Sequence, residues 1–215
     1  MDAKDFTRRF HGALLINKPA GMSSFAVIEQ IQKAMRARWG WKRSELPKMG
    51  HGGTLDPFAT GLLVLGVGRG VKLSRYFLGS EKTYEGLIRF GETTSSGDPT
   101  NEVTERTESL PQSHEALRTL ASQLCAQDYL QTPPMHSAKK VDGKRLYELA
   151  RQGIEVEREA RTCKLRDFEI LSFDGVRATF RVSCSSGTYI RRLAQDLARW
   201  SGALGMLETL CRTAC

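Results

Sequence analysis

The sequence lacks the features of a secreted or membrane-spanning protein. Its five cysteines form no C-x-x-C pair, and their odd number argues against a complete disulfide framework, so we expect reduced thiols. The longest apolar run, Leu62 to Val67, is far too short to cross a bilayer, and the N-terminal stretch MDAKDFTRRFHG contains no apolar signal-peptide segment. These absences favour a cytoplasmic location without a membrane partner.

Internal repeats, low-complexity tracts and a strict βαβ rhythm are also missing. Without that rhythm a nucleotide-binding α/β fold is not expected, and Gly66-Val67-Gly68-Arg69-Gly70 departs from the dinucleotide fingerprint. The 215 residues are 40% hydrophobic and 26% charged, which is enough to bury a sizeable core. We therefore predict a single domain, residues 1–215, of the α+β class.

Positive charge is in excess. The chain has 32 Lys and Arg against 24 Asp and Glu, with a net charge of +8 and a pI near 9.4. This balance fits a partner with a dense negative backbone, such as nucleic acid. Many soluble proteins are equally basic for solubility alone, so charge by itself does not identify the partner.

The spacing of apolar residues predicts the regular elements. Helical spacing occurs in the ranges 24–38, 71–78, 113–126, 146–152 and 189–200, and strand patterns occur in 13–16, 62–67, 82–90, 163–173 and 176–184. The strand at 13–16 is expected to be buried. Ser23, Ser24 and Ser113 are candidate N-caps, and Asp174-Gly175 is a hairpin signal between the last two strands.

Three segments are predicted to be loops. Arg38 to Lys48 is basic, has two tryptophans, and is a candidate for RNA contact. Gly50 to Gly61 contains four glycines and one proline, which is typical of a shaped loop. Thr93 to Thr107 is polar and rich in turn-forming residues, so we expect a mobile surface connection.

The glycine-rich loop carries a carboxylate and a histidine. Asp56 follows His51 by five residues, and the surrounding glycines allow the backbone to approach a ligand closely. Pro57 restrains the backbone after Asp56 and has no N–H, so a turn there presents the carboxylate in one orientation. Asp before Pro is also a common turn starter, and the spacing alone leaves a purely structural turn open.

Five segments, in the same order, resemble the TruB family of tRNA pseudouridine synthases. The resemblance runs from about residue 12 to Leu210 and so covers nearly the whole chain. The matching segments are Asn17-Lys18-Pro19 with Gly21 to Ser24, Gly50 to Lys72, Lys82-Thr83-Tyr84, Pro133-Pro134-Met135 with Ser137-Ala138 and Gly143 to Tyr147, and Gly187 to Arg191.

The resemblance implies a fold and an activity. The fold is the pseudouridine synthase fold, a mixed and mainly antiparallel sheet flanked by helices and loops around an active-site cleft. The activity is conversion of the T-loop uridine of tRNA, at position 55 in tRNA numbering, to pseudouridine after base flipping. No cofactor and no metal are implied, and the expected partner is the T-arm of tRNA, bound by a monomer without guide RNA.

The resemblance also assigns catalytic roles by matching position. Asp56 is the nucleophile, Tyr84 stacks on the target base, and Arg191 pairs with Asp56. The reaction breaks an N1 glycosidic bond and remakes it at C5 without a change in oxidation state, and a carboxylate can add to the substrate and depart again. Stacking on a tyrosine returns about 1 to 3 kcal/mol of the cost of base flipping.

Four further residues are assigned to the substrate site. In the resemblance His51 contacts the rearranged RNA loop, Tyr189 shapes the pocket and Leu210 contributes an apolar wall. Lys18 lies close by. Without the matching segments these residues would be interpreted as ordinary loop or core positions.

The chain departs from the family pattern in places. His136 stands where the family usually has tyrosine, and Lys139 where an apolar residue is expected, which adds basic or hydrogen-bonding character near the RNA. Many members continue into a small C-terminal RNA-binding domain of the PUA type, which we expect to be absent here because the sequence stops at Cys215; either the protein is naturally minimal or this sequence is a fragment.

Three other functions remain open. One is an RNA-folding module that remodels tRNA with dispensable catalysis. Another is a carboxylate hydrolase using His51 and Asp56, which would release free uracil; the segments around Tyr84 and Arg191 argue against it. The third is the catalytic subunit of an RNA-guided complex, whose relatives share the G-T-L-D-P sequence and which would need a guide RNA; the bacterial-style flanking sequence argues against it.

Overall fold

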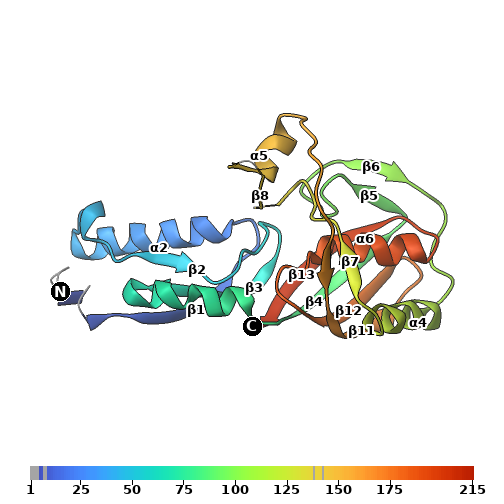
Figure 1. Ribbon diagram of the computed structural model, residues 1–215, viewed down its shortest axis with the longest axis horizontal. Helices are drawn as coiled ribbons and strands as arrows, with labels where there is room; N and C mark the ends of the chain where they lie inside the picture. Colours follow the sequence, from blue (N-terminus) through green and yellow to red (C-terminus); the bar gives the residue numbers. More distant parts are fainter. Residues whose placement is uncertain (1–4, 7–8, 138, 142) are drawn as a thin grey trace. The chain divides into compact units, whose positions relative to one another are not determined.

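The computed structural model describes residues 5–6, 9–137, 139–141 and 143–215, so Ala138 of the Ser137-Ala138 match lies outside it. The chain forms two compact units, residues 1–80 with 211–215 and residues 81–210 (Figure 1). A single catalytic domain over residues 1–215 stays a prediction. Within the described ranges, no helix is long and apolar enough to span a membrane.

The first unit is built around strand β3. Strands β1 and β2 pair with β3 in antiparallel fashion, and residues 211 and 212 at the end of β13 run parallel to it. Its elements are β1 (Gly12–Lys18), α2 (Ser24–Trp39), the 3-10 helix η1 (Arg43–Glu45), β2 (Met49–His51), β3 (Thr60–Val67), the 3-10 helix η2 (Gly68–Leu73) and α3 (Ser74–Gly79).

Helix α2 confirms the prediction for residues 24–38. Ser23 is its N-cap, with a hydroxyl that accepts a hydrogen bond from the Ala26 N–H at 3.0 Å. Gly40 ends the helix at φ 69° and donates its N–H to the Arg36 carbonyl at 2.8 Å. The helix buries Val27, Ile28 and Met35 on one face, as the apolar spacing predicts.

One expectation for this unit was wrong. Strand β1 is not buried: Leu14 is 42% and Leu15 71% exposed, because β1 is an edge strand that, among the described strands, pairs with β3 alone. The segment 38–48, predicted as a loop, is irregular after Trp39 apart from the 3-10 helix η1, and part of it is buried. Trp41 is buried beside Met35 and stacks on Trp39 with ring centroids 4.6 Å apart, since an indole buries much apolar area.

The second unit contains a sheet in the order β13-β4-β12-β11, with β12 antiparallel to both β4 and β11. Helix α4 packs against β11 and α6 (Figure 1). Its elements are β4 (Lys82–Phe90), β5 (Glu92–Thr94), β6 (Val103–Arg106), α4 (His114–Cys125), β7 (Tyr129–Gln131), β8 (Lys140–Val141), β9 (Lys144–Arg145), α5 (Leu146–Arg151), β10 (Arg161–Cys163), β11 (Leu165–Phe173), β12 (Arg177–Cys184), α6 (Ile190–Trp200) and β13 (Gly205–Ala214).

The predicted hairpin joins β11 and β12. The Asp174 carboxylate accepts hydrogen bonds from the N–H groups of Val176 and Arg177 at 2.9 and 2.6 Å, and Gly175 takes φ 101°. Cys163, expected at the start of the same strand, instead pairs with Tyr129 of β7. Mixed strands and helices confirm the α+β class.

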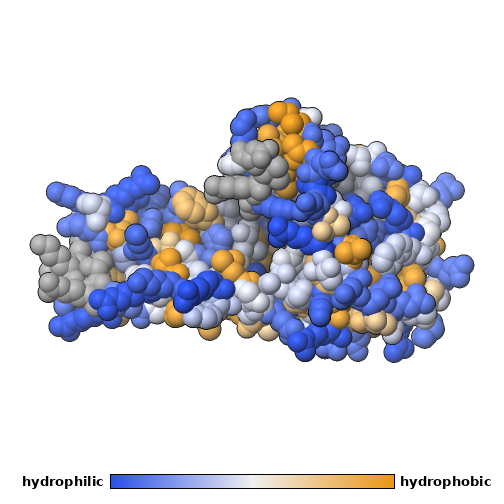
Figure 2. All heavy atoms as spheres, viewed as in Figure 1, coloured by the Kyte–Doolittle hydropathy of each residue, from blue (hydrophilic) through white to orange (hydrophobic). Residues whose placement is uncertain are grey.

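Hydrophobic side chains of the second unit gather between its sheet and its helices. Ile88 and Phe180 on the strands and Leu193 and Leu197 on α6 are each at most 1% exposed. Hydrophilic residues cover most of the face drawn in Figure 2, while hydrophobic spheres gather over the α5 segment at the top of the view. Residues of both the sheet and α6 thus contribute to the buried interior of this unit.

Candidate active site

Asp56 begins a tight turn. Its carbonyl accepts a hydrogen bond from the Ala59 N–H at 3.1 Å, and Pro57 occupies the second position of the turn. Proline favours that position because its ring sets φ near the value that the turn requires. The turn predicted from Asp-Pro is present, and the side chain of Asp56 is half-buried.

Buried side chains hold the backbone on both sides of Asp56. The Ser24 hydroxyl donates to the Leu55 carbonyl at 3.1 Å and accepts from the Leu55 N–H at 2.8 Å. On the other side, the Pro57 carbonyl accepts from the Lys18 ammonium at 3.2 Å and from the Gly21 N–H at 2.8 Å. The position of Asp56 is thus fixed by contacts with residues more than thirty positions away.

Lys18 is a completely buried cation. Its ammonium donates to the carbonyls of Pro19, Met22 and Pro57, so all three of its donors are used. Burial lowers the pKa of Lys18 from its usual value, and the negative charge of Asp56 opposes that change. The resemblance placed Lys18 close to the site, and its electrostatic interaction with Asp56 agrees.

His51 lies at the end of β2, opposite Leu65 of β3. In the part of the chain that the structure describes, its buried Nδ1 has no hydrogen-bond partner. Burial lowers the pKa of His51 below its usual value, and the positive charge of Arg212 lowers it further. The imidazole is therefore neutral at pH 7.

Arg212 binds backbone carbonyls in and beside the glycine-rich loop, a role that the sequence did not predict. It is 1% exposed, and it donates from Nε to the Leu62 carbonyl at 2.7 Å and from Nη2 to the Gly53 carbonyl at 3.1 Å. Gly61 lies beside it, and a Cβ there would meet the Arg212 carbonyl oxygen at 2.3 Å. Glycine at 61 is thus required for the close approach of these two strands.

Arg191, in α6 of the second unit, is 4% exposed and makes several polar contacts. Its Nη1 donates to the Ser96 carbonyl at 2.8 Å and lies 3.3 Å from the Asp98 carboxylate. Its Nη2 donates to the carbonyl of His136 at 2.7 Å. His136, one of the departures from the family pattern, therefore contributes a backbone group to the surroundings of Arg191.

The segment 93–107 is only partly the mobile surface connection that its composition predicts. Thr94, Ser96 and Asp98 are 2 to 4% exposed, although Thr104 and Glu105 in β6 are exposed. The buried side chains satisfy one another, since Thr94 donates to the Asp98 carbonyl at 2.7 Å and Ser96 to the Asp98 carboxylate at 2.8 Å. A polar segment is buried here because its partners, including Arg191, are polar too.

Tyr84 lies in β4 opposite Val182 of β12 and is 8% exposed. Strand alternation places it on one face with Ile88 and Phe90, which are also buried, and this confirms the strand predicted at 82–90. Leu210, in β13, is 5% exposed. Both side chains are in positions fixed by regular strands.

Tyr189 is the N-cap of α6, and its backbone is held by Gln131. The Gln131 side chain accepts from the Tyr189 N–H at 2.7 Å and donates to the Tyr189 carbonyl at 3.0 Å. Gln131 also donates to the Tyr129 hydroxyl at 3.2 Å, which in turn donates to Asp196 at 2.6 Å. No local signal in the sequence indicates this role of Gln131.

The seven predicted residues are divided between the two units. Lys18, His51 and Asp56 lie in the first unit around the glycine-rich loop. The pairing of Asp56 with Arg191 joins residues of different units and stays a prediction. Tyr84, Tyr189, Arg191 and Leu210 belong to the second unit.

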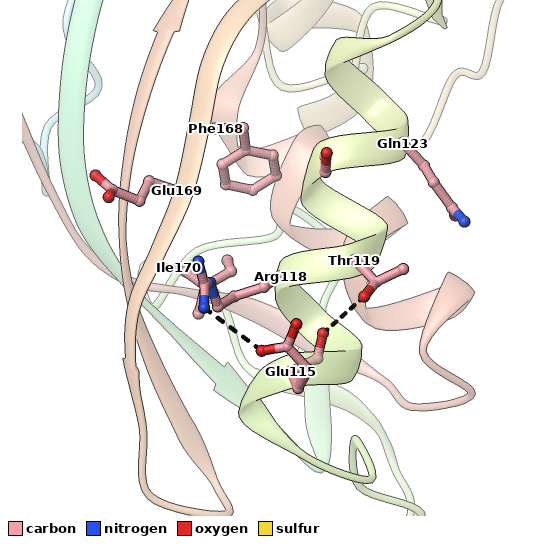
Figure 3. A pocket seen from close by; sticks show the side chains of 8 residues that line it. Glu115, Arg118, Thr119, Gln123, Phe168, Glu169 and Ile170 are labelled. Atoms are coloured by element: carbon pink, nitrogen blue, oxygen red, sulfur yellow. Dashed lines mark hydrogen bonds and ion pairs between the residues drawn. The ribbon is translucent and has the colours of Figure 1, made fainter.

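A surface groove lies elsewhere in the second unit, between α4 and β11 (Figure 3). Its volume is about 420 Å³, and a salt bridge of 3.4 Å joins Arg118 to Glu115 along it. None of the predicted site residues lines it. The groove is lined by Glu115, Arg118, Thr119, Ser122, Gln123, Phe168, Glu169 and Ile170.

Relatives of known function resemble this chain over most of its length. Residues 41–190 match the model of the TruB family pseudouridylate synthase N-terminal domain. A tRNA pseudouridine synthase B of Bordetella parapertussis is 44% identical over 204 residues, which cover 94% of this chain and 80% of the relative. A tRNA pseudouridine synthase B of an Azoarcus species is 42% identical over 215 residues, 100% of this chain and 68% of that relative.

Solved structures support the fold. A chain in the crystal structure of a Cbf5-Nop10-Gar1 complex has a TM-score of 0.68 and 23% sequence identity over 99% of this chain. A chain in the archaeal box H/ACA sRNP Nop10-Cbf5 complex has a TM-score of 0.60, also at 23% identity. The present chain spans about half the length of each. By family match, relatives and fold together, the chain belongs to the TruB family of pseudouridylate synthases.

Proposed function

We propose that this chain converts a uridine in the T-loop of tRNA, at position 55 in tRNA numbering, to pseudouridine, with Asp56 as the nucleophile. The N1–C1′ glycosidic bond breaks and a C5–C1′ bond forms, while C5 loses a proton and N1 gains one. Atoms and oxidation state balance without a cofactor. The carboxylate of Asp56 adds to the substrate or assists the loss of the uracil, and then departs.

The observation that carries the proposal is the way in which Asp56 is held. Ser24 and Lys18 bind the backbone on either side of it, and the turn from Asp56 to Ala59 limits its directions. A nucleophile must be placed within a fraction of an ångström of its target to be effective. The named activity of relatives at 42 to 44% identity agrees with such a site.

The other residues support this chemistry. Tyr84 stacks on the flipped base, and Arg191 pairs with Asp56 and so stabilises the ionised carboxylate. Tyr189 and Leu210 shape the pocket. His51, whose buried Nδ1 has no partner within the described chain, contacts the RNA loop.

The proposal also includes the partner and the place of action. The substrate is the T-arm of tRNA, bound by a monomer without guide RNA. The net charge of +8 supports a polyanionic substrate. A cytoplasmic location follows from the proposed substrate and from the unpaired cysteines.

Pseudouridine mapping on an unmodified tRNA transcript tests the proposal. Purified protein is incubated with the transcript, in the presence of a metal chelator and without nucleotide, beside the variants Asp56→Asn and Asp167→Asn. Asp167 is exposed on β11 and serves as the matched control. We expect one pseudouridine in the T-loop from the wild type and from Asp167→Asn, and none from Asp56→Asn.

The same experiment separates the alternatives. An unmodified transcript that is nevertheless bound and remodelled would favour the RNA-folding module. Free uracil in the supernatant would favour the hydrolase. Modification that appears only after a guide RNA is added would favour the RNA-guided subunit.

A further inference from the structure

We propose that Ser24 is a positioning residue for the nucleophile, acting through the backbone of Leu55; this inference rests on the proposed function. The Ser24 hydroxyl donates to the Leu55 carbonyl at 3.1 Å and accepts from the Leu55 N–H at 2.8 Å. Ser24 is 2% and Leu55 3% exposed, so water does not compete for these groups. One hydroxyl therefore holds both polar groups of one residue.

These two hydrogen bonds restrain the backbone of Asp56. The Leu55 carbonyl belongs to the peptide plane that also contains the Asp56 nitrogen and Cα, so fixing that carbonyl fixes the plane from which the Asp56 side chain departs. Beyond Asp56, the Pro57 ring restrains φ, and Lys18 and Gly21 hold the Pro57 carbonyl. With both flanking planes fixed, Asp56 retains only its side-chain torsions.

Ser24 is not needed to cap the helix that it begins. The N-cap of α2 is Ser23, whose hydroxyl accepts from the Ala26 N–H at 3.0 Å and is exposed. The two neighbouring serines thus have different roles: Ser23 caps α2, and Ser24 binds Leu55, the residue before the proposed nucleophile. The chain itself provides a matched pair, with the same side chain and the same substitution at adjacent positions.

The experiment compares Ser24→Ala with Ser23→Ala in the full chain. Single-turnover rates of pseudouridine formation are measured at saturating tRNA, at a temperature where circular dichroism shows both variants folded, and tRNA affinity is measured separately. We expect Ser24→Ala to lower the rate on the order of 10²-fold, which is the effect of a displacement of about 1 Å at a reacting group. We expect tRNA affinity to stay within about twofold, and Ser23→Ala to keep the wild-type rate, because neither serine hydroxyl touches the reacting atoms.

Two further variants keep the test decisive. Ser24→Thr retains the hydroxyl and should recover most of the lost rate. Ser24→Cys fills the site with a weak hydrogen-bonding group and should be slow like Ser24→Ala; it replaces that variant if alanine prevents folding.

The outcomes that overturn the inference are distinct from those that overturn the function. If the wild type is active and Ser24→Ala and Ser23→Ala have equal rates, the positioning role is contradicted but the proposed function is not. The same holds if Ser24→Thr is folded and as slow as Ser24→Ala. A wild type that forms no pseudouridine removes the proposed function and this inference with it.

Discussion

Single buried polar residues hold backbone groups that lie far away in the sequence. Ser24 binds Leu55, Lys18 binds Pro57, and Gln131 binds Tyr189. Each removes two or more groups from water and satisfies them, which contributes little net stability but makes the contact costly to break. Substitution at such a residue leaves buried backbone groups without their hydrogen-bond partners.

Among the buried polar residues, we expect substitution of Asp98 to lower the free energy of unfolding the most. Asp98→Ala removes the carboxylate beside Arg191 and leaves a buried guanidinium with one charge partner fewer. We expect the free energy of unfolding to fall by about 3 to 5 kcal/mol, the usual effect of breaking a buried ion pair. Urea unfolding followed by circular dichroism measures it. Asp167→Ala, on the exposed side of β11, should stay within about 0.5 kcal/mol of wild type; equal losses in the two variants would contradict the prediction.

His51 should titrate below the usual histidine pKa of 6.5. Because the unfolded chain takes up this proton at a higher pH than the folded chain, His51 lowers the free energy of unfolding as the pH falls below 6.5. Arg212→Gln removes the neighbouring charge and should raise the pKa of His51 while burial continues to lower it. NMR titration of the imidazole ring protons measures both values. An unchanged His51 pKa in Arg212→Gln would mean that burial alone causes the decrease.

At the scale of elements, α6 shows how a helix can be placed without a capping side chain. Its N-cap, Tyr189, makes no side-chain cap hydrogen bond, and Gln131 binds the Tyr189 N–H and carbonyl instead. Further along, Asp196 accepts from the Tyr129 hydroxyl and pairs with Arg192 at 3.0 Å. Burial and the charge of Asp196 raise the pKa of Tyr129, so that its hydroxyl stays a donor. The start of α6, and with it Arg191, is thus held by β7.

Gln131→Met tests this attachment. Methionine fills a similar volume but leaves the Tyr189 N–H and carbonyl without their partners, so we expect the free energy of unfolding to fall by about 1 to 3 kcal/mol. The Tyr189 amide should also exchange with solvent faster. Denaturant unfolding and hydrogen exchange measure these effects. Gln123→Met, on the exposed side of α4, is the control, and a Tyr189 amide equally protected in both variants would refute the attachment.

At the scale of the whole molecule, the elements that form from local contacts were the ones that the sequence predicted well. Helices α2 and α4 begin at Ser23 and Ser113 as expected, because a cap and a helical stripe involve residues three or four positions apart. The Asp174-Gly175 hairpin is local in the same sense. Strand β1 was placed correctly, but its burial was not, since pairing at an edge depends on the rest of the sheet.

The residues of the candidate site were predicted from a local pattern or from the family resemblance. His51 and Asp56 were candidates from their glycine-rich loop, and the resemblance gave their roles and added Lys18. Neither source indicated Arg212 or Asp98. The partner of Arg212, Gly53, is 159 residues away, and Ser96 is 95 residues from Arg191. A buried polar residue with a distant partner has the composition of a surface residue, so pattern analysis places it outside.

The net charge of +8 leads to a prediction about tRNA binding. Lys and Arg that neutralise phosphates release counterions, so the logarithm of the affinity should fall linearly with the logarithm of the salt concentration. If about 6 to 10 phosphates are contacted, affinity should drop roughly 10³- to 10⁵-fold between about 50 and 200 mM salt. Fluorescence anisotropy with labelled tRNA measures the slope. Ser24→Ala serves as the control: its slope should equal that of the wild type, because a buried serine contacts no phosphate, although its rate of pseudouridine formation is reduced. A slope near zero for the wild type would mean that the positive charge plays no part in binding.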